Sequence, residues 1–243
     1  MKKIITTIFF LMISIAIKAQ NNFQIDTIKT HAGNLQIFFI GHATLMFEFK
    51  GLIIHIDPVG RYADYTEMPK ADLILITHQH GDHLDPKAIE QITKGGTKIY
   101  CNAASLPSLN AGTVLNNGDT ATFKGIKIEA VPAYNIAHKN PGGQLFHPKG
   151  IGNGYVLTIG SIRIYIAGDT ENIPEMRNLK NIDIAFLPMN LPYTMTPSMV
   201  ADAVRMFNPK ILYPYHYGNT DVNELLKLLK DKKDCEIRVR KMN

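Results

Sequence analysis

Short apolar runs alternate with turn residues along the chain from residue 35 onward. The first four runs cover residues 35–40, 43–49, 52–57 and 72–77, and glycine, histidine or proline closely follows each of them. Apolar runs of this length, separated by turn residues, are typical of β-strands. The first three come in quick succession, with Gly51 between the second and the third, so the pattern predicts antiparallel hairpins at the start of the fold.

Helical patterns come only after the fourth run. Asp85 is a capping residue and Pro86 suits the first helical position, which together predict a helix over residues 86–93. Strand patterns return at 97–101, 122–134, 154–159 and 161–167, and two further runs, 181–188 and 210–215, flank a helix that opens with the cap Thr196 and covers 196–207. A helix over 221–230 and a strand over 235–239 follow. Strands and then helices, twice over, predict an α/β (α+β) fold in which two sheets pack face to face with helices outside.

The N-terminus has the layout of a secretory signal peptide. Two lysines precede an uncharged run over residues 4–17, which is shorter than the 18 or more residues of a membrane span. Ile17 and Lys18 make an imperfect cleavage site, so a permanent anchor is the alternative. We expect residues 1–19 to be a signal peptide, 20–34 an N-terminal extension and 35–243 one domain, in a protein that is exported to the periplasm or secreted and keeps no stable membrane span after cleavage.

Net charge and cysteine content limit the class of protein and the redox chemistry that the chain can have. The 243 residues carry 26 Lys+Arg against 21 Asp+Glu, and three of the lysines lie in the leader, so a net charge of only +2 remains after cleavage. This balance, without an arginine-rich stripe, excludes a nucleic-acid-binding protein. Cys101 and Cys235 could form one disulfide in an oxidising compartment or remain two buried free thiols.

Three of the nine histidines fall within six residues, in His78-Gln79-His80-Gly81-Asp82-His83. This cluster directly follows the apolar run that ends at Thr77 and precedes the helix capped by Asp85. It therefore occupies a strand-to-helix loop at the end of a sheet, where catalytic groups are often found. Imidazoles bind borderline metals well, a carboxylate adds negative charge, and a tight loop lets the side chains diverge toward two neighbouring ions. The cluster predicts a metal site rather than a solvated polar loop.

On these residues the chain resembles the metallo-β-lactamase superfamily of metal-dependent hydrolases, and within it the branch of lactonase-like and N-acyl-phosphatidylethanolamine phospholipase-like enzymes. The likeness runs from about Gly41 to Gly218 through the motifs GHAT (41–44), IDP (56–58), THQHGDHLD (77–85), GYV (154–156), YIAGDT (165–170) and YPYHYG (213–218). The resemblance implies a four-layer αββα sandwich of two mixed β-sheets, with one or two metal ions in loops at one edge of the sheets.

The resemblance also implies a role for each matching residue. The first metal would be bound by His78 and His80, the second by Asp82, His83 and His216, and Asp169 would bridge the two ions. The sequence holds an internal comparison for the bridging residue, because Gly-Asp-Thr occurs at 118–120 and again at 168–170. The second copy ends an apolar strand, whereas Asp119 follows Asn116-Asn117-Gly118 and is predicted to lie in an exposed hairpin turn.

The third ligand of the first site departs from the family pattern. The family usually has a histidine just after a strand such as the one ending at Ala133, and here Tyr134-Asn135 stand in that place. We favour His147 as the replacement, because Phe146 and Pro148 flank it, over His138 in a polar stretch, with Asn135 as a further candidate. The first site is then weak or open, and the number of bound ions is one or two.

Three more polar residues lie at or near strand ends. Asp57 ends a strand and is interpreted as orienting a ligand imidazole, with a turn cap as the alternative. His42, in the first strand-end loop, is a candidate for positioning substrate. His55 alternates with apolar neighbours inside a strand and is expected to be a core residue.

These assignments predict a metal-dependent hydrolase in which a metal-bound hydroxide attacks an ester, lactone, amide or phosphodiester, with Asp82 orienting the hydroxide and assisting proton transfer. Two zinc ions are the expected cofactor, and the mixed nitrogen and oxygen ligands leave manganese and iron open. The loops 135–150 and 189–197 are rich in apolar residues, which favours a small-molecule or lipid-like substrate over a polyanion. The alternative is an exported metal- or partner-binding module of the same fold that has lost turnover.

Overall fold

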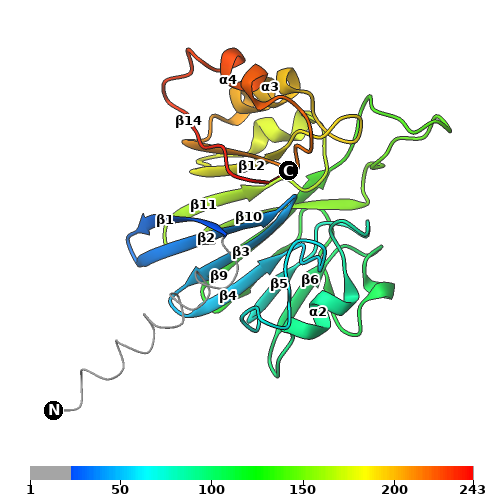
Figure 1. Ribbon diagram of the computed structural model, residues 1–243, viewed down its shortest axis with the longest axis vertical. Helices are drawn as coiled ribbons and strands as arrows, with labels where there is room; N and C mark the ends of the chain where they lie inside the picture. Colours follow the sequence, from blue (N-terminus) through cyan, green and yellow to red (C-terminus); the bar gives the residue numbers. More distant parts are fainter. Residues whose placement is uncertain (1–22, 243) are drawn as a thin grey trace.

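Two seven-stranded β-sheets form the centre of the computed structural model, which describes residues 23–242 (Figure 1). The expected signal peptide, residues 1–19, lies outside the described residues. In both sheets the strands lie side by side in the order in which they occur along the chain. Within residues 23–242, no helix is both long enough and apolar enough to cross a membrane.

The first sheet contains β1 (Gln24–Thr30), β2 (Gly33–Gly41), β3 (Thr44–Phe49), β4 (Leu52–Ile56), β5 (Leu73–Leu75), β6 (Lys98–Cys101) and β7 (Thr113–Val114). The pairs from β1 to β4 are antiparallel, which confirms the predicted hairpins, and those from β4 to β7 are parallel.

The second sheet contains β8 (Thr120–Phe123), β9 (Ile126–Ala133), β10 (Gly152–Ile159), β11 (Ile162–Ile166), β12 (Ile184–Pro188), β13 (Ile211–Tyr215) and β14 (Glu236–Ile237). It repeats the plan of the first, because the pairs from β8 to β11 are antiparallel and those from β11 to β14 are parallel. Loops that leave the parallel strands of each sheet therefore start from the carboxyl ends of neighbouring strands, where functional side chains can gather.

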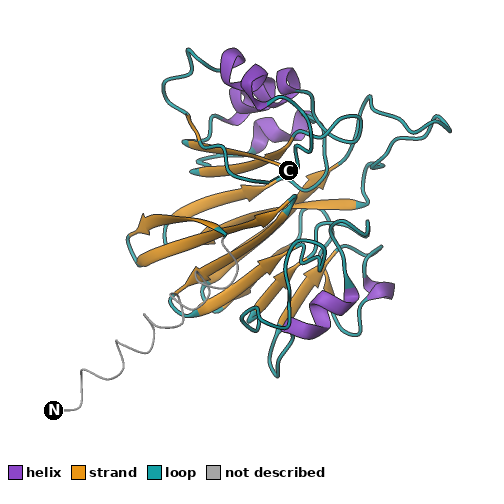
Figure 2. Cartoon of the chain, viewed as in Figure 1, coloured by secondary structure: helices purple, strands orange, loops and turns teal. Residues whose placement is uncertain are grey.

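The helices lie on the outer faces of the two sheets (Figure 2). They are α2 (Pro86–Ile92), α3 (Pro197–Phe207) and α4 (Val222–Leu228), with short 3₁₀ turns η1 (Leu106–Ser108) and η2 (Pro174–Asn178). Each α-helix starts where the sequence predicted: the side chains of Asp85, Thr196 and Asp221 accept hydrogen bonds from the first-turn backbone N–H groups.

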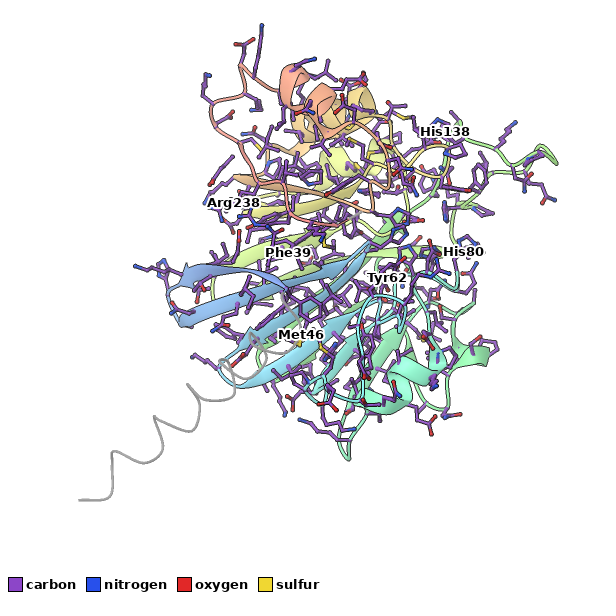
Figure 3. The ribbon with its side chains drawn as sticks, in the orientation of Figure 1. Phe39, Met46, Tyr62, His80, His138 and Arg238 are labelled. Carbon is purple, nitrogen blue, oxygen red and sulfur yellow. The ribbon has the colours of Figure 1, made fainter. Side chains whose placement is uncertain are left out.

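Both faces of the central strands are buried, which explains why these strands read as continuous apolar runs. On β2, Leu35, Ile37 and Phe39 point between the sheets, while Phe38 faces the layer that contains α2. Successive side chains of a strand point to opposite faces, so a single apolar run contributes side chains to the cores on both sides of the sheet. Figure 3 labels Phe39 in the core between the sheets and Met46 in the core on the α2 side. With a third core between the second sheet and α3, these layers confirm the four-layer αββα sandwich.

The hydrophobic pattern misses strand β1, which lies within the segment 20–34 that we expected to be an extension. β1 pairs with β2 over seven residues at the edge of the sheet. Its sequence, QIDTIKT, contains no apolar run, and all of its side chains are exposed or half-buried. Two isolated isoleucines, Ile25 and Ile28, pack against the cores, and Asp26 adds charge contacts by accepting hydrogen bonds from the guanidinium of Arg240 at 2.7 and 2.9 Å. The two-residue strand β7 is also missed, since it is too short to form a pattern.

The two cysteines are free thiols, which is the second of the two alternatives left open. Cys101 is buried in the core on the α2 side, and Cys235 is buried in the core beneath α3. Burial raises the pKa of both thiols, so both stay protonated at neutral pH.

His55 on β4 is a core residue, as the alternation of its neighbours predicted. It is fully buried, and its Nε2–H donates to the carbonyl oxygen of Pro69 at 3.0 Å. Burial lowers the pKa of this imidazole from 6.5 to about 4. The folded protein therefore keeps His55 neutral at a pH where the unfolded chain already binds a proton.

We expect His55 to make the protein acid-sensitive. Above about pH 6.5 the neutral imidazole costs the folded state nothing relative to the unfolded state. As the pH falls toward about 4, the unfolded state binds a proton that folded His55 does not, so the free energy of unfolding decreases by roughly 3 kcal/mol. In His55→Gln this decrease should be absent, so the unfolding free energies of variant and wild type, measured by urea titration, should converge as the pH falls. The exposed His31→Gln is the control and should follow the wild type. A constant difference between His55→Gln and wild type would contradict this origin.

Candidate metal centre

The histidine-rich motif forms a tight turn between β5 and α2. The backbone N–H groups of His83 and Leu84 both donate to the carbonyl oxygen of His80 at 2.9 Å. This turn points successive side chains in different directions, as expected from the sequence. His78 and His83 are buried, while His80 and Asp82 are half-buried and reach the surface of the site.

The first group of donor atoms contains three imidazoles. His80 Nδ1 lies 3.1 Å from His78 Nε2 and 3.2 Å from His147 Nε2. All three atoms lie within 4.8 Å of one another, so one ion could contact them together. The structure thus brings His147, 67 residues beyond His80, to the place where the sequence left the third ligand open.

The second group contains Asp82, His83 and His216. Asp82 Oδ2 lies 3.5 Å from His216 Nε2 and 4.0 Å from His83 Nε2. His42 belongs to this group as well, because its Nε2 lies 3.2 Å from the same carboxylate oxygen, and the four donor atoms fall within 4.8 Å of one another. From the sequence, His42 is interpreted only as a residue that positions substrate. Its position after a strand end, like those of His78 and His216, is the signal that could have predicted its place in the second group.

Asp169 lies between the two groups and presents one oxygen to each. Its Oδ2 lies 3.2 Å from His147 Nε2 and 3.8 Å from His78 Nε2 in the first group. Its Oδ1 lies 3.3 Å from His83 Nε2 and 3.4 Å from His216 Nε2 in the second group. This is the arrangement that a bridging carboxylate requires.

The backbone before Asp169 explains how a carboxylate can be placed so deeply. Gly168 has φ +64°, and a Cβ at this position would lie 2.7 Å from the carbonyl oxygen of Asn153 and 3.1 Å from the Cβ of Thr77. A larger residue would push β11 away from its neighbours. The other Gly-Asp-Thr copy lacks this setting: Asp119 accepts a hydrogen bond from the N–H of Asn116 in an exposed turn, as predicted. The turn is not the predicted hairpin, because β7 and β8 on either side of it belong to different sheets.

The electrostatics of the centre favour positive charge. Burial would raise the pKa of Asp169, but the imidazoles of His216 and His83 hold that pKa well below its ordinary value. Burial would likewise lower the pKa of His83, but the carboxylates of Asp169 and Asp57 raise it well above its ordinary value. Burial lowers the pKa of His78, which keeps that imidazole in the neutral form that binds metals.

Residues behind the donor groups orient them. Asp57 Oδ2 accepts a hydrogen bond from His83 Nδ1 at 2.8 Å, and Asp57 also accepts from the N–H and hydroxyl of Thr77. The buried Asp57 thus contacts a candidate ligand imidazole, in agreement with the orienting role rather than a simple turn cap. Asn135 does the same for the first group: its Oδ1 accepts from His147 Nδ1 at 2.7 Å, on the side of that ring opposite to the donor atom Nε2.

Three residues near the centre have positive backbone φ angles, which residues other than glycine rarely adopt. His42, Asp57 and His216 have φ values of +54°, +46° and +47°. A left-handed conformation is unfavourable for these residues, so contacts with the surrounding structure must stabilise it. Such strained residues cluster at functional sites. One of these contacts is direct, because the N–H of His216 donates to the carbonyl oxygen of His42 at 2.9 Å.

His138 lies outside both groups. Its Nδ1 lies 3.0 Å from Glu171 Oε1, and Figure 3 shows it apart from His80. Tyr62, also labelled in Figure 3, lies on the opposite side of the centre and stacks on His42, with ring centroids 5.4 Å apart.

The donor atoms fit a metal centre. Four of them, His83 Nε2, Asp169 Oδ1 and both ring nitrogens of His216, are buried without a hydrogen-bond partner. Buried polar atoms without partners are costly, and those of His83, Asp169 and His216 Nε2 converge on one point. A divalent cation among nitrogen and oxygen donors would satisfy them.

A cavity of about 320 Å³ opens over the centre. It is lined by His80, Asp82, Phe146, His147, Asp169, Asn190, Tyr193 and His216. The rings of Phe146 and Tyr193 meet edge to face, with centroids 4.9 Å apart, and form an apolar wall beside the donor atoms.

Comparison with known proteins agrees with this geometry. The model of the β-lactamase superfamily domain matches residues 36–216. A UPF0173 metal-dependent hydrolase from Thermococcus onnurineus is 36% identical over 224 residues, which cover 84% of this chain and 96% of that protein.

Among solved structures, a protein of Parabacteroides distasonis that is described as a metal-dependent hydrolase is 55% identical, with a TM-score of 0.87, over 91% of this chain and 100% of that one. Igni18, a metallo hydrolase from Ignicoccus hospitalis, shares the fold with a TM-score of 0.70 at 24% identity, over 86% and 96% of the two chains. The chain therefore belongs to the β-lactamase superfamily and is a metal-dependent hydrolase.

Proposed function

We propose that this hydrolase binds two zinc ions and cleaves neutral esters, lactones or amides that carry an apolar group. The observation that carries the proposal is the position of Asp169, whose two oxygens face two separate groups of donor atoms. His78, His80 and His147 would hold one ion, and Asp82, His83 and His216 the other. Manganese and iron share this preference for nitrogen and oxygen donors and are the alternatives to zinc.

When bound, zinc would supply a Lewis acid that polarises the scissile carbonyl and lowers the pKa of water to about 7. The chain's own part begins with Asp82, which lines the cavity and is half-buried. Burial opposes its ionisation, but the neighbouring imidazoles of His216 and His42 hold the pKa of Asp82 well below its ordinary value. Asp82 is thus a carboxylate at neutral pH, able to accept a hydrogen bond from an attacking water and so to orient it.

The cavity wall supports the choice of substrate. Among the described residues that line the cavity there is no lysine or arginine, the side chains that usually bind phosphate or carboxylate groups. Phe146 and Tyr193 offer an apolar surface, and Leu191 and Ile136 are exposed on the two loops that carry these rings. A neutral substrate with an acyl chain or ring suits this wall better than a polyanion.

The loss of Asp169 should abolish most activity. Asp169→Ala removes the carboxylate that faces both donor groups, so we expect kcat/KM on a chromogenic ester or lactone to fall by about 10³-fold or more. Asp119→Ala is the matched control, because it alters the same tripeptide in an exposed turn, and should keep activity within about twofold of wild type. Turnover by Asp169→Ala equal to that of wild type would refute the mechanism.

Substrate class can be tested on the same protein. We expect kcat/KM for apolar lactones and acyl esters to exceed that for an aryl phosphodiester by about tenfold or more, and Tyr193→Ala to lower the former by about tenfold through loss of apolar contact. Leu226→Ala, which alters an exposed residue of α4, is the control. A preference for the phosphodiester, or unchanged ester hydrolysis in Tyr193→Ala, would argue against the proposed substrate.

A further inference from the structure

The loop after β9 winds around a buried carboxylate, that of Glu171. This side chain has no exposed surface. Its Oε2 accepts hydrogen bonds from the N–H groups of Ile136 and Ala137, both at 2.9 Å, and its Oε1 accepts from the N–H of His138 at 2.7 Å. Three successive backbone donors thus converge on one carboxylate, which lies two residues after Asp169.

Glu171 also fixes the orientation of an amide. Asn135 Nδ2 donates to Glu171 Oε1 at 3.0 Å and to the carbonyl oxygen of Tyr193 at 2.9 Å. Both acceptors lack a hydrogen to donate in return, so the NH₂ end of the amide must face them. The carbonyl end of Asn135 must therefore face the opposite way.

That carbonyl oxygen determines the state of His147. Asn135 Oδ1 accepts from the backbone N–H of His147 at 2.8 Å and lies 2.7 Å from its ring Nδ1. Because Oδ1 can only accept, the ring proton must reside on Nδ1, which leaves the lone pair on Nε2. Nε2 is the atom that lies 3.2 Å from both His80 Nδ1 and Asp169 Oδ2.

We propose that Glu171, acting through Asn135, is a positioning residue that selects the tautomer and ring orientation of His147 for the first metal site. The inference rests on the proposed function in one respect, that His147 is a ligand of that site. The chain Glu171–Asn135–His147 takes the place of the strand-end histidine of the family pattern, where this sequence has Tyr134-Asn135. It supplies a ligand from 12 residues farther along the loop and gives it a fixed protonation state.

The far end of the loop has a separate anchor that serves as a control. Lys149 Nζ lies 2.7 Å from Glu175 Oε1, and the hydroxyl of Tyr134 donates to Glu175 Oε2 at 2.8 Å. In the described structure the Glu175 carboxylate forms no hydrogen bond or ion pair with Asn135 or His147, so Glu175→Gln should loosen the loop without altering the amide that orients the imidazole.

The test is a competitive Zn²⁺ titration of the full-length protein against a chelator. We expect two binding steps in wild type, and in Glu171→Gln a first-site affinity lowered by about 10- to 100-fold with the second step unchanged. Asn135→Ala, which leaves Glu171 and its backbone donors intact, should show the same selective loss. Glu175→Gln should retain both steps. Equal weakening of both steps in Glu171→Gln, or normal first-site affinity in Asn135→Ala, would overturn the proposal.

A second measurement needs no hydrolysis and can be made on the metal-free protein. The ¹⁵N NMR signals of the His147 ring, recorded with zinc and after its removal, should show the proton on Nδ1 in wild type and in Glu175→Gln. In Asn135→Ala and Glu171→Gln the metal-free ring should become a mixture of tautomers. A fixed Nδ1–H tautomer in both of the latter variants would contradict the role of Glu171 even if the enzyme is active. The expected tautomers together with a failure to hydrolyse esters would instead refute only the proposed function.

Discussion

The site depends on one buried carboxylate that must be neutralised from two sides. Asp169 is almost completely buried at the end of β11 and is contacted by imidazoles of both donor groups. A buried carboxylate is stable only when positive charge or hydrogen-bond donors surround it. The centre provides several imidazoles and leaves some of their nitrogens without partners, which is the arrangement of a site that is complete only with cations.

The fold surrounds Asp169 with these groups because its two sheets have the same plan and meet at the edge where their parallel strands end. Each sheet changes from antiparallel to parallel pairing at its fourth strand, and the loops after the parallel strands deliver Asp57 and His78 from one sheet, Asp169 and His216 from the other. The apolar core between the sheets holds the two edges in register, with the rings of Phe39 and Phe186 in contact across it at 6.2 Å between centroids. Tertiary packing therefore sets distances that no local segment could fix.

The local parts of this arrangement could be predicted from the sequence. The caps Asp85 and Thr196, most of the strands and the histidine-rich turn depend on neighbouring residues, and the comparison of Asp169 with Asp119 separated a strand end from an exposed turn. What could not be predicted depends on distant contacts. Strand β1 has no apolar run and contacts Arg240 from the opposite end of the chain, and His147 lies in a long loop where Asn135 accepts hydrogen bonds from its backbone and its ring. Glu171 gave no signal, since a single glutamate after a strand has no pattern of its own.

The most direct test of the account is the location of metal ions by anomalous diffraction from crystals of protein purified without chelator. The account predicts two peaks on either side of Asp169, one in contact with His78, His80 and His147 and the other with Asp82, His83 and His216. A single peak, or a first-site ion that His147 does not contact, would contradict the claim that one buried carboxylate joins two metal sites.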